Sequence, residues 1–394
     1  MSLHIREDVI ARDSANANNI AADSQFWPGE SIRLAVDDLD NLFAWATRSG
    51  ASDIRLESNK PAVLQVHGRL LRVTRRRLTD GEIEEAVNRL YGADGVARLK
   101  SGQDFDVSYE IQPDRRTRLR FRVNATAVLS RGSDGGAVVA RTMAEKSPRL
   151  ADLKVEPDII ANFKVRQGFV IVAGGTENGK STLLAAMTRD LLEDPDSHRS
   201  ILEYASPIEF VYDDIEGASA TISQSEIPRH LPSFAAGARN AVRRNPKVVI
   251  IGECRDSETM PVACQLSIAG CCVMTTVHAG SIHETVQRCV SLCPVEERAA
   301  VTVQLAQSLR LIINQRLVPS RDGKRTALRE FLVFDDALRR RLLRSSPDNW
   351  PEICTEALKS NGQSFSQAVA VALEEGRISE EVAFAIRREF GDVA

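Results

Sequence analysis

The sequence predicts an α/β protein with two differently built domains, and two observations support this fold class. Between residues 36 and 145, strand-like runs prevail and one helical pattern interrupts them, which is typical of a mixed α+β domain. From residue 168, near-continuous apolar runs alternate with helical segments. Such runs are expected of strands that are buried on both faces, so we predict a doubly wound parallel sheet in this part of the chain.

Composition limits the classes of function that fit this chain. Its 394 residues, of which 43% are hydrophobic and 27% charged, are typical of a globular protein with room for two domains. The net charge of −3 gives no reason to expect direct binding of nucleic acid. No apolar run approaches the roughly 18 residues that span a bilayer, and the N-terminus lacks the apolar core of a signal peptide. We therefore expect a cytoplasmic protein that touches a membrane only through partners.

We predict five segments along the chain. They are a flexible N-terminal arm (1–35), an N-terminal α+β domain (36–145), a linker (146–160), the parallel-sheet domain (161–334) and a C-terminal helical region (335–394). The arm is polar, with "SANANN" and "WPGES", and such composition favours disorder.

The first domain is predicted to begin with a helix over 31–50, in which Leu39, Leu42 and Phe43 have helical spacing and Gly50 ends the pattern. A second helix is expected over 80–92. Strands are expected over 51–57, 61–73, 105–111, 118–130 and 136–143.

The second domain is predicted to contain several buried strands and a helix that begins at Lys180. The strands are expected over 168–175, 199–204, 247–253, 271–278 and 311–318. Helical patterns follow over 336–345, 364–376 and 379–391. All seven cysteines lie after residue 253 without a Cys-x-x-Cys pair, so we interpret them as reduced core thiols and not as zinc ligands.

The segment "AGGTENGKST" (173–182) has the spacing of a phosphate-binding loop, G-x-x-x-x-G-K-S, and it joins a buried strand to a helix as that motif requires. The alternative is a plain glycine-rich turn. In such a loop, backbone N–H groups hold the β-phosphate, the lysine reaches the β- and γ-phosphates, and the serine holds Mg²⁺. The predicted ATP-binding residues are Gly174, Gly175, Thr176, Asn178, Gly179, Lys180, Ser181 and Thr182. We therefore predict a RecA-like nucleotide-binding domain.

Glu177 puts a carboxylate inside this loop. The position is often glycine because its backbone tends towards positive φ, which costs another residue about 1 kcal/mol. A carboxylate also opposes phosphate unless it points outward. We expect weakened, but not abolished, nucleotide binding.

A second acid is expected at the end of a neighbouring strand, where it would hold Mg²⁺ and the attacking water. The segment "KVVIIGECRDSET" places Gly252 and Glu253 after four apolar residues, and Glu253 is the candidate.

Three arginines alternate along the strand expected over 118–130. Arg118, Arg120 and Arg122 would share one face, and guanidinium groups suit phosphate oxygens. The alternative is a solvated edge strand. We interpret the triple-arginine runs at 75–77 and 339–341 as solvated faces.

Several short blocks resemble, in order, the signature motifs of one protein family. They are "ASDIRLE", "RFRVNATAVLSRG", "SPIEFVYDDI", "GECRDSET" and "VMTTVHAGS". The family is the secretion and type IV pilus ATPases, or PilT/GspE superfamily. Segments 222–246 and 327–335 are similar to its DotB/TraJ type, which serves type IVB secretion and conjugation.

The resemblance implies roles for individual residues. Glu253 matches the Walker B acid and would bind Mg²⁺ together with Ser181. Glu209 matches a glutamate that acts on the attacking water, and His278 matches a histidine that reports the γ-phosphate to the neighbouring subunit. Two arginines of the first domain, Arg122 and Arg141, match residues that clamp the phosphates.

The resemblance also implies a PAS-like first domain and a homohexameric ring that hydrolyses ATP with Mg²⁺. The implied partners are inner-membrane components and a coupling ATPase of a type IVB secretion or conjugation apparatus. On this reading the ring is cytoplasmic and associates peripherally with the inner membrane.

Three departures from the family pattern predict slowed hydrolysis: Glu177 in the loop, Ala205 and Ser206 before "PIEF", and Cys271 in place of a histidine. The alternatives are a pilus retraction motor, a nucleic-acid translocase, and an ATP-binding scaffold with weakened hydrolysis.

Overall fold

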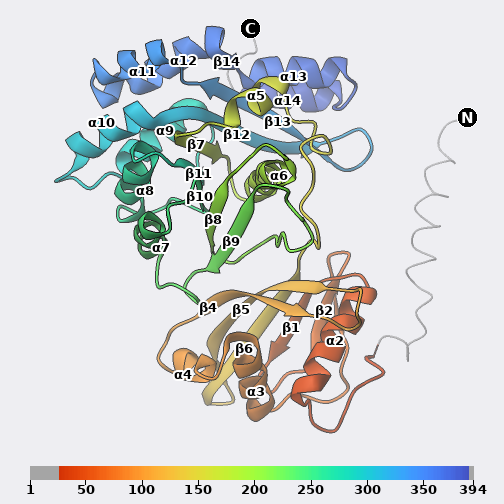
Figure 1. Ribbon diagram of the computed structural model, residues 1–394. Coiled ribbons are helices and arrows are strands. Elements are labelled where there is room, and N and C mark those ends of the chain that lie inside the picture. The colour runs from red at the N-terminus through yellow and green to blue at the C-terminus, as the bar shows by residue number, and fades with distance from the viewer. Residues whose placement is uncertain (1–25, 390–394) are drawn as a thin grey trace, which may run out of the picture. The chain divides into compact units, whose positions relative to one another are not determined.

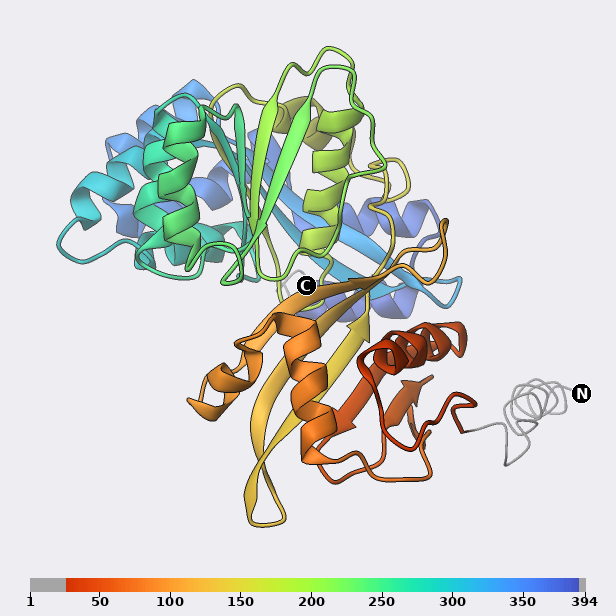
Figure 2. The ribbon, with the colours of Figure 1, turned by 60° about the horizontal axis from the view of Figure 1, so that its bottom comes forward.

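The computed structural model describes residues 26–389, and the chain divides into two compact units, residues 1–145 and 146–394 (Figures 1 and 2). The first unit holds a six-stranded antiparallel sheet in the order β3-β2-β1-β6-β5-β4. The strands are β1 (Ala51–Glu57), β2 (Val63–Val66), β3 (Arg69–Arg72), β4 (Phe105–Ile111), β5 (Leu119–Ser130) and β6 (Ser133–Thr142).

Three helices belong to this unit: α2 (Val36–Arg48), α3 (Asp80–Tyr91) and α4 (Gly95–Lys100). Their apolar faces share one core with the sheet, in which Leu42 and Ile83 pack with Ile54 and Val123. Figure 2 shows α2 and α3 against the same side of the strands. The run predicted as one strand over 61–73 is a hairpin, because His67 and Gly68 both have positive φ and turn the chain.

Residues 26–35 differ from the expected flexible arm, while residues 1–25 lie outside the described part of the chain. Trp27 is buried, and its N–H donates to the Val73 carbonyl at 2.8 Å. Glu30 accepts from the N–H groups of Arg75 and Arg76 at 2.9 and 3.0 Å. One buried indole and these backbone contacts hold a segment whose composition alone favours disorder.

The second unit holds an eight-stranded sheet in the order β14-β13-β12-β7-β11-β10-β8-β9. The strands are β7 (Gly168–Ala173), β8 (Ser200–Ala205), β9 (Thr221–Glu226), β10 (Val248–Ile251), β11 (Cys272–Val277), β12 (Leu309–Pro319), β13 (Arg325–Val333) and β14 (Gly362–Gln363). β12 through β9 are parallel, whereas β13 and β14 pair antiparallel.

Helices cover both faces of this sheet. They are α5 (Pro157–Phe163), α6 (Lys180–Glu193), α7 (Phe234–Ala241), α8 (Thr259–Ile268), α9 (Ile282–Ser291), α10 (Arg298–Ser308), α11 (Asp336–Leu343), α12 (Trp350–Asn361), α13 (Phe365–Glu374) and α14 (Glu380–Glu389). Val170 and Val172 pack into the core with α5 and α6, whereas Phe169 and Ile171 pack into the core with α7 to α10. Figure 1 shows α6 on one side of the strands and α7, α8 and α10 on the other. The predicted doubly wound α/β fold is confirmed.

Three features of this unit bear on the sequence predictions. β9, β13 and α12 were not predicted. The seven cysteines are buried thiols. Among the described residues, no helix is long and apolar enough to cross a membrane.

Candidate functional site

The predicted phosphate-binding loop lies between β7 and α6, and its backbone requires glycine at two positions. Gly174 has φ 149° and Gly179 has φ 72°, in the region that L side chains disfavour. A Cβ on Gly174 would lie 2.4 Å from the Gln315 carbonyl oxygen. Because α6 begins at Lys180 without a side-chain cap, the N–H groups of its first turn can bind an anion.

Lys180 is held inside the loop. It is buried, and its Nζ donates to the Gly175 carbonyl at 2.7 Å. Burial lowers the pKa of Lys180, while the nearby carboxylates of Glu253 and Glu209 oppose this lowering. A phosphate in the loop would supply the opposite charge that a buried ammonium needs.

The order of the sheet places the predicted catalytic residues beside the loop. β7, β11, β10 and β8 are consecutive parallel strands. Their carboxyl ends meet at one edge, which is the usual ligand site of an open α/β sheet. Lys180 follows β7, His278 follows β11, Glu253 follows β10, and Glu209 lies in the loop after β8.

Glu253 and His278 form a pair at this edge. His278 Nε2 lies 3.5 Å from Glu253 Oε1. The loops that carry them are joined, because Thr276 Oγ1 donates to the Gly252 carbonyl at 2.6 Å and the Cys254 N–H donates to the Thr276 carbonyl at 3.0 Å. Burial and the charge of Lys180 lower the pKa of His278, and Glu253 opposes this lowering. Burial and Lys180 thus disfavour the charged imidazolium form of His278.

Two residues of β9 hold the segment that carries Glu209. Glu226 Oε2 accepts from the Ile208 N–H at 3.1 Å, and Gln224 Nε2 donates to the Phe210 carbonyl at 2.8 Å. The backbone is thus fixed on both sides of Glu209. Sequence reasoning missed both residues, since it did not predict β9.

Two of the departures from the family pattern, Ala205 and Cys271, lie at the ends of strands. Ala205 ends β8, and its carbonyl accepts the Ile227 N–H at 2.8 Å. Glu203, two residues before Ala205 on β8, accepts from Gln224 Nε2 at 2.6 Å. Cys271 precedes β11 and so lies at the amino end of that strand, opposite the edge that carries His278. The sheet therefore separates Cys271 from the candidate site.

Asn178 has protein partners on β12. Its Oδ1 accepts from the Leu317 N–H at 3.1 Å, and its carbonyl accepts from Gln315 Nε2 at 2.7 Å. Its side chain fixes the loop to the sheet. Thr176 is exposed, while Ser181 and Thr182 are half-buried in the first turn of α6.

Glu177 has the predicted backbone conformation, with φ 62°. Its side chain is exposed, and its carbonyl accepts from Arg325 Nη1 at 3.5 Å. The expectation of a positive φ is thereby confirmed, and its effect on nucleotide affinity stays a prediction.

The oxygen donors expected to hold Mg²⁺ fit that ion. Ser181 offers a hydroxyl and Glu253 a carboxylate, and Mg²⁺ is usually bound by one or two protein oxygens with phosphate and water completing its shell. Within residues 26–389, no three His, Cys, Asp or Glu side chains form a metal cluster of their own.

The predicted arginines of the first unit lie together on its sheet. Arg122 and Arg141 are cross-strand partners on β5 and β6. Arg122 Nε lies 3.0 Å from Asp106 Oδ2, and Arg141 Nε lies 3.0 Å from Asp53 Oδ1. Arg120 is buried. The alternative of a solvated edge strand is wrong, because β5 lies between β6 and β4.

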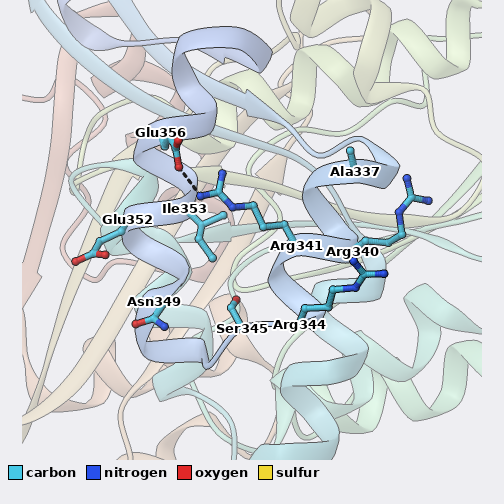
Figure 3. Close-up of a pocket in the computed structure, with 9 residues that line it drawn as sticks. All are labelled: Ala337, Arg340, Arg341, Arg344, Ser345, Asn349, Glu352, Ile353 and Glu356. Atoms are coloured by element: carbon cyan, nitrogen blue, oxygen red, sulfur yellow. Dashed lines mark hydrogen bonds and ion pairs between the residues drawn. The ribbon is translucent and has the colours of Figure 1, made fainter.

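A cavity of about 670 Å³ lies between α11 and α12, and its lining includes none of the residues at the carboxyl edge of the parallel sheet. In Figure 3, Arg341 reaches across to Glu356, whereas Arg340 and Arg344 point away from α12. Because its arginines do not converge, we assign no ligand to this cavity.

The fold and the residues at the carboxyl edge define a RecA-like P-loop NTPase. The chain belongs to the type II/IV secretion system protein family, whose model matches residues 30–333.

Known members of the family are similar over most of the chain. The ATPase DotB of Legionella pneumophila is 41% identical, with a TM-score of 0.87 over 92% of this chain and 98% of that one. A structure of the pilus retraction motor PilT with bound ADP is 25% identical, with a TM-score of 0.75 over 88% of this chain and 96% of that one. PilT of Pseudomonas aeruginosa is 32% identical over 305 residues, which cover 77% of this chain and 84% of that protein.

These similarities confirm the resemblance to the DotB-type ATPases and the predicted arrangement of a PAS-like domain, a RecA-like domain and C-terminal helices. They also support an ATPase that binds nucleotide.

Replacing Glu177 with glycine should tighten nucleotide binding. Glycine removes a carboxylate from the phosphate loop, which is worth up to about 1 kcal/mol, or roughly fivefold in affinity. It also relieves a positive φ that is present without nucleotide, and this relief alters affinity only where the loop changes conformation on binding. Titration with a fluorescent ADP analogue and Mg²⁺ measures the change. Glu177→Gln keeps the strained backbone and removes only the charge, so it separates the two causes. Unchanged affinity in both variants would show that Glu177 is accommodated without cost.

His278 should titrate below its usual pKa in the nucleotide-free protein. Because Glu253 favours the charged imidazole, Glu253→Gln should lower this pKa further, and Arg288→Gln should raise it since Arg288 disfavours that form. The shift of the histidine ring signal with pH in NMR spectra measures both effects, with His278→Asn identifying the signal. A pKa above the usual value in the unmodified protein would contradict this electrostatic picture.

Proposed function

We propose that this protein is a homohexameric motor that hydrolyses ATP to drive substrate export or assembly in a type IVB secretion or conjugative transfer system. The observation that carries the proposal is the row of Lys180, His278, Glu253 and Glu209 at one edge of the sheet. The 41% identity to Legionella DotB over nearly the whole of both chains supports the assignment to this apparatus.

The proposed chemistry assigns one task to each group. Loop N–H groups and Lys180 bind the phosphates. The γ-phosphate would then face the carboxyl edge of the sheet, where Glu253 and His278 lie. Glu209, held by β9, orients the attacking water. A bound Mg²⁺ supplies charge neutralisation at the phosphates, with Ser181 and Glu253 as its protein ligands. A ring N–H of His278 can donate to a γ-phosphate oxygen or to Glu253, which lies 3.5 Å from Nε2. The position of the imidazole can therefore report which nucleotide is bound.

Arg122 and Arg141 complete the proposed set as phosphate contacts from the first unit. A guanidinium that is released from its carboxylate can pair with phosphate oxygens instead. We propose inner-membrane components and a coupling ATPase as partners of the ring, which would be cytoplasmic and peripheral to the inner membrane. Nucleic acid is not a proposed ligand.

Two other functions keep specific support. A pilus retraction motor is supported by the 32% identity to PilT. An ATP-binding scaffold with weakened hydrolysis is supported by the strained, acidic Glu177 in the phosphate loop.

ATP turnover should depend on Glu253. We expect Mg-ATP hydrolysis by a particle with the mass of a hexamer. Glu253→Gln should reduce turnover about a hundredfold or more, because it removes a charged ligand of the Mg²⁺ that would neutralise the phosphates. Steady-state phosphate release and light scattering measure the two properties. A hexamer that binds ATP without turnover in the unmodified protein would favour the scaffold.

Arg141 should matter for turnover beyond its bond to Asp53. If it contacts phosphate, Arg141→Gln should lower turnover roughly tenfold or more, while Asp53→Asn, which breaks the same ion pair, should leave turnover largely intact. Hydrolysis rates and unfolding temperatures of both variants are compared. If both variants lose turnover equally and in proportion to their loss of stability, Arg141 acts only as a structural partner of Asp53.

A further inference from the structure

Two buried polar side chains lie directly behind the phosphate-binding loop. Gln315 of β12 and Arg329 of β13 are cross-strand partners in the sheet, and they are 3% and 1% exposed. No step of the proposed chemistry uses either group. A buried arginine is costly unless every part of its guanidinium is paired, so its partners indicate its task.

Arg329 binds the segment Leu153–Glu156, which precedes α5. Its Nη1 donates to the Lys154 carbonyl at 3.1 Å and lies 3.0 Å from Glu156 Oε2, and its Nη2 donates to the Leu153 carbonyl at 3.0 Å. This segment belongs to the linker expected from the sequence. The guanidinium therefore holds the linker through two main-chain carbonyls and one side-chain carboxylate.

Arg329 also sets the orientation of Gln315. Its Nε donates to Gln315 Oε1 at 2.8 Å. Since a guanidinium only donates, the amide must turn its oxygen to Arg329 and its Nε2 to the other side. There Nε2 donates to the Asn178 carbonyl at 2.7 Å. Asn178 directly precedes Gly179, whose added Cβ would lie 3.0 Å from the same Nε2.

The bonds thus run without a break from linker to loop. We propose that Gln315 and Arg329 are positioning residues for the phosphate-binding loop, and that they make nucleotide affinity depend on the docking of Leu153–Glu156. This inference rests on the proposed nucleotide-binding function. Undocking the linker removes three acceptors of Arg329, frees it to shift, and releases Gln315 from the single orientation that supports the loop.

Such coupling is reciprocal. If the docked linker favours nucleotide binding, then bound nucleotide must favour the docked linker by the same factor. Nucleotide should therefore slow hydrogen exchange of backbone amides around 153–156 as well as in the loop. This readout uses the unmodified full chain.

Three substitutions test this series of hydrogen bonds, one at Gln315 beside the loop and two at Glu156 in the linker. Gln315→Glu is isosteric and keeps an acceptor for Arg329, but it places a carboxylate oxygen against the Asn178 carbonyl. Glu156→Ala removes an acceptor at the linker end, and Glu156→Gln restores an acceptor oxygen. The matched control is Glu356→Gln, which alters an exposed ion pair with Arg341. Each is measured by titration with a fluorescent ADP analogue and Mg²⁺, by thermal unfolding, and by hydrogen exchange.

We expect Gln315→Glu to weaken ADP binding roughly tenfold and Glu156→Ala roughly fivefold, within the usual range of coupling between sites. Glu156→Gln should recover most of the loss, and Glu356→Gln should bind as the unmodified chain does. In Gln315→Glu, nucleotide should no longer slow exchange at the linker. Lower unfolding temperatures with unchanged ADP affinity in the variants would overturn the inference. So would hydrogen exchange at 153–156 that nucleotide does not slow in the unmodified chain. Failure of the unmodified chain to bind any nucleotide would instead refute the proposed function.

Discussion

The site depends on one constraint, the parallel order of β7, β11, β10 and β8. Parallel strands end in the same direction, so four loops that are far apart in sequence meet at one edge. The strands stay in this order because both faces are buried, with alternate residues committed to two separate cores. A slip by one residue would exchange those faces. Packing therefore fixes the strand ends, and the strand ends fix the distances between Lys180, Glu253 and His278.

Buried polar groups then determine how firmly each loop is held. Arg329 and Glu226 are each about 1% exposed, and each binds backbone groups of a segment near the site. A buried charge is tolerated only where its partners stay in place. The same bonds that offset the cost of burial therefore make the loops behind Glu209 and Lys180 rigid.

The sequence predicts the elements that are dominated by burial and misses those that are dominated by polar bonds. β7, β10 and β11 are nearly pure apolar runs, and the loop after β7 has a fixed spacing. β9 is polar and lies at the sheet edge, and β13 carries Arg329 and Glu330 at its centre, so neither has a hydrophobic period to detect. The contacts of Gln224, Gln315 and Arg329 join residues far apart in sequence, which no local pattern reports. Resemblance supplied Glu209 and His278, whose environments alone would not have identified them.

The segment whose sequence suggested the DotB type lies close to the candidate site. Residues 222–246, whose sequence suggested that type, include Gln224 and Glu226, the two side chains that hold the loop carrying Glu209. The same segment continues into α7 and to Val242, whose apolar side chain is 66% exposed. One short stretch thus connects a solvent-facing surface to the backbone around Glu209. β9 therefore joins this exposed surface to the proposed catalytic edge of the sheet.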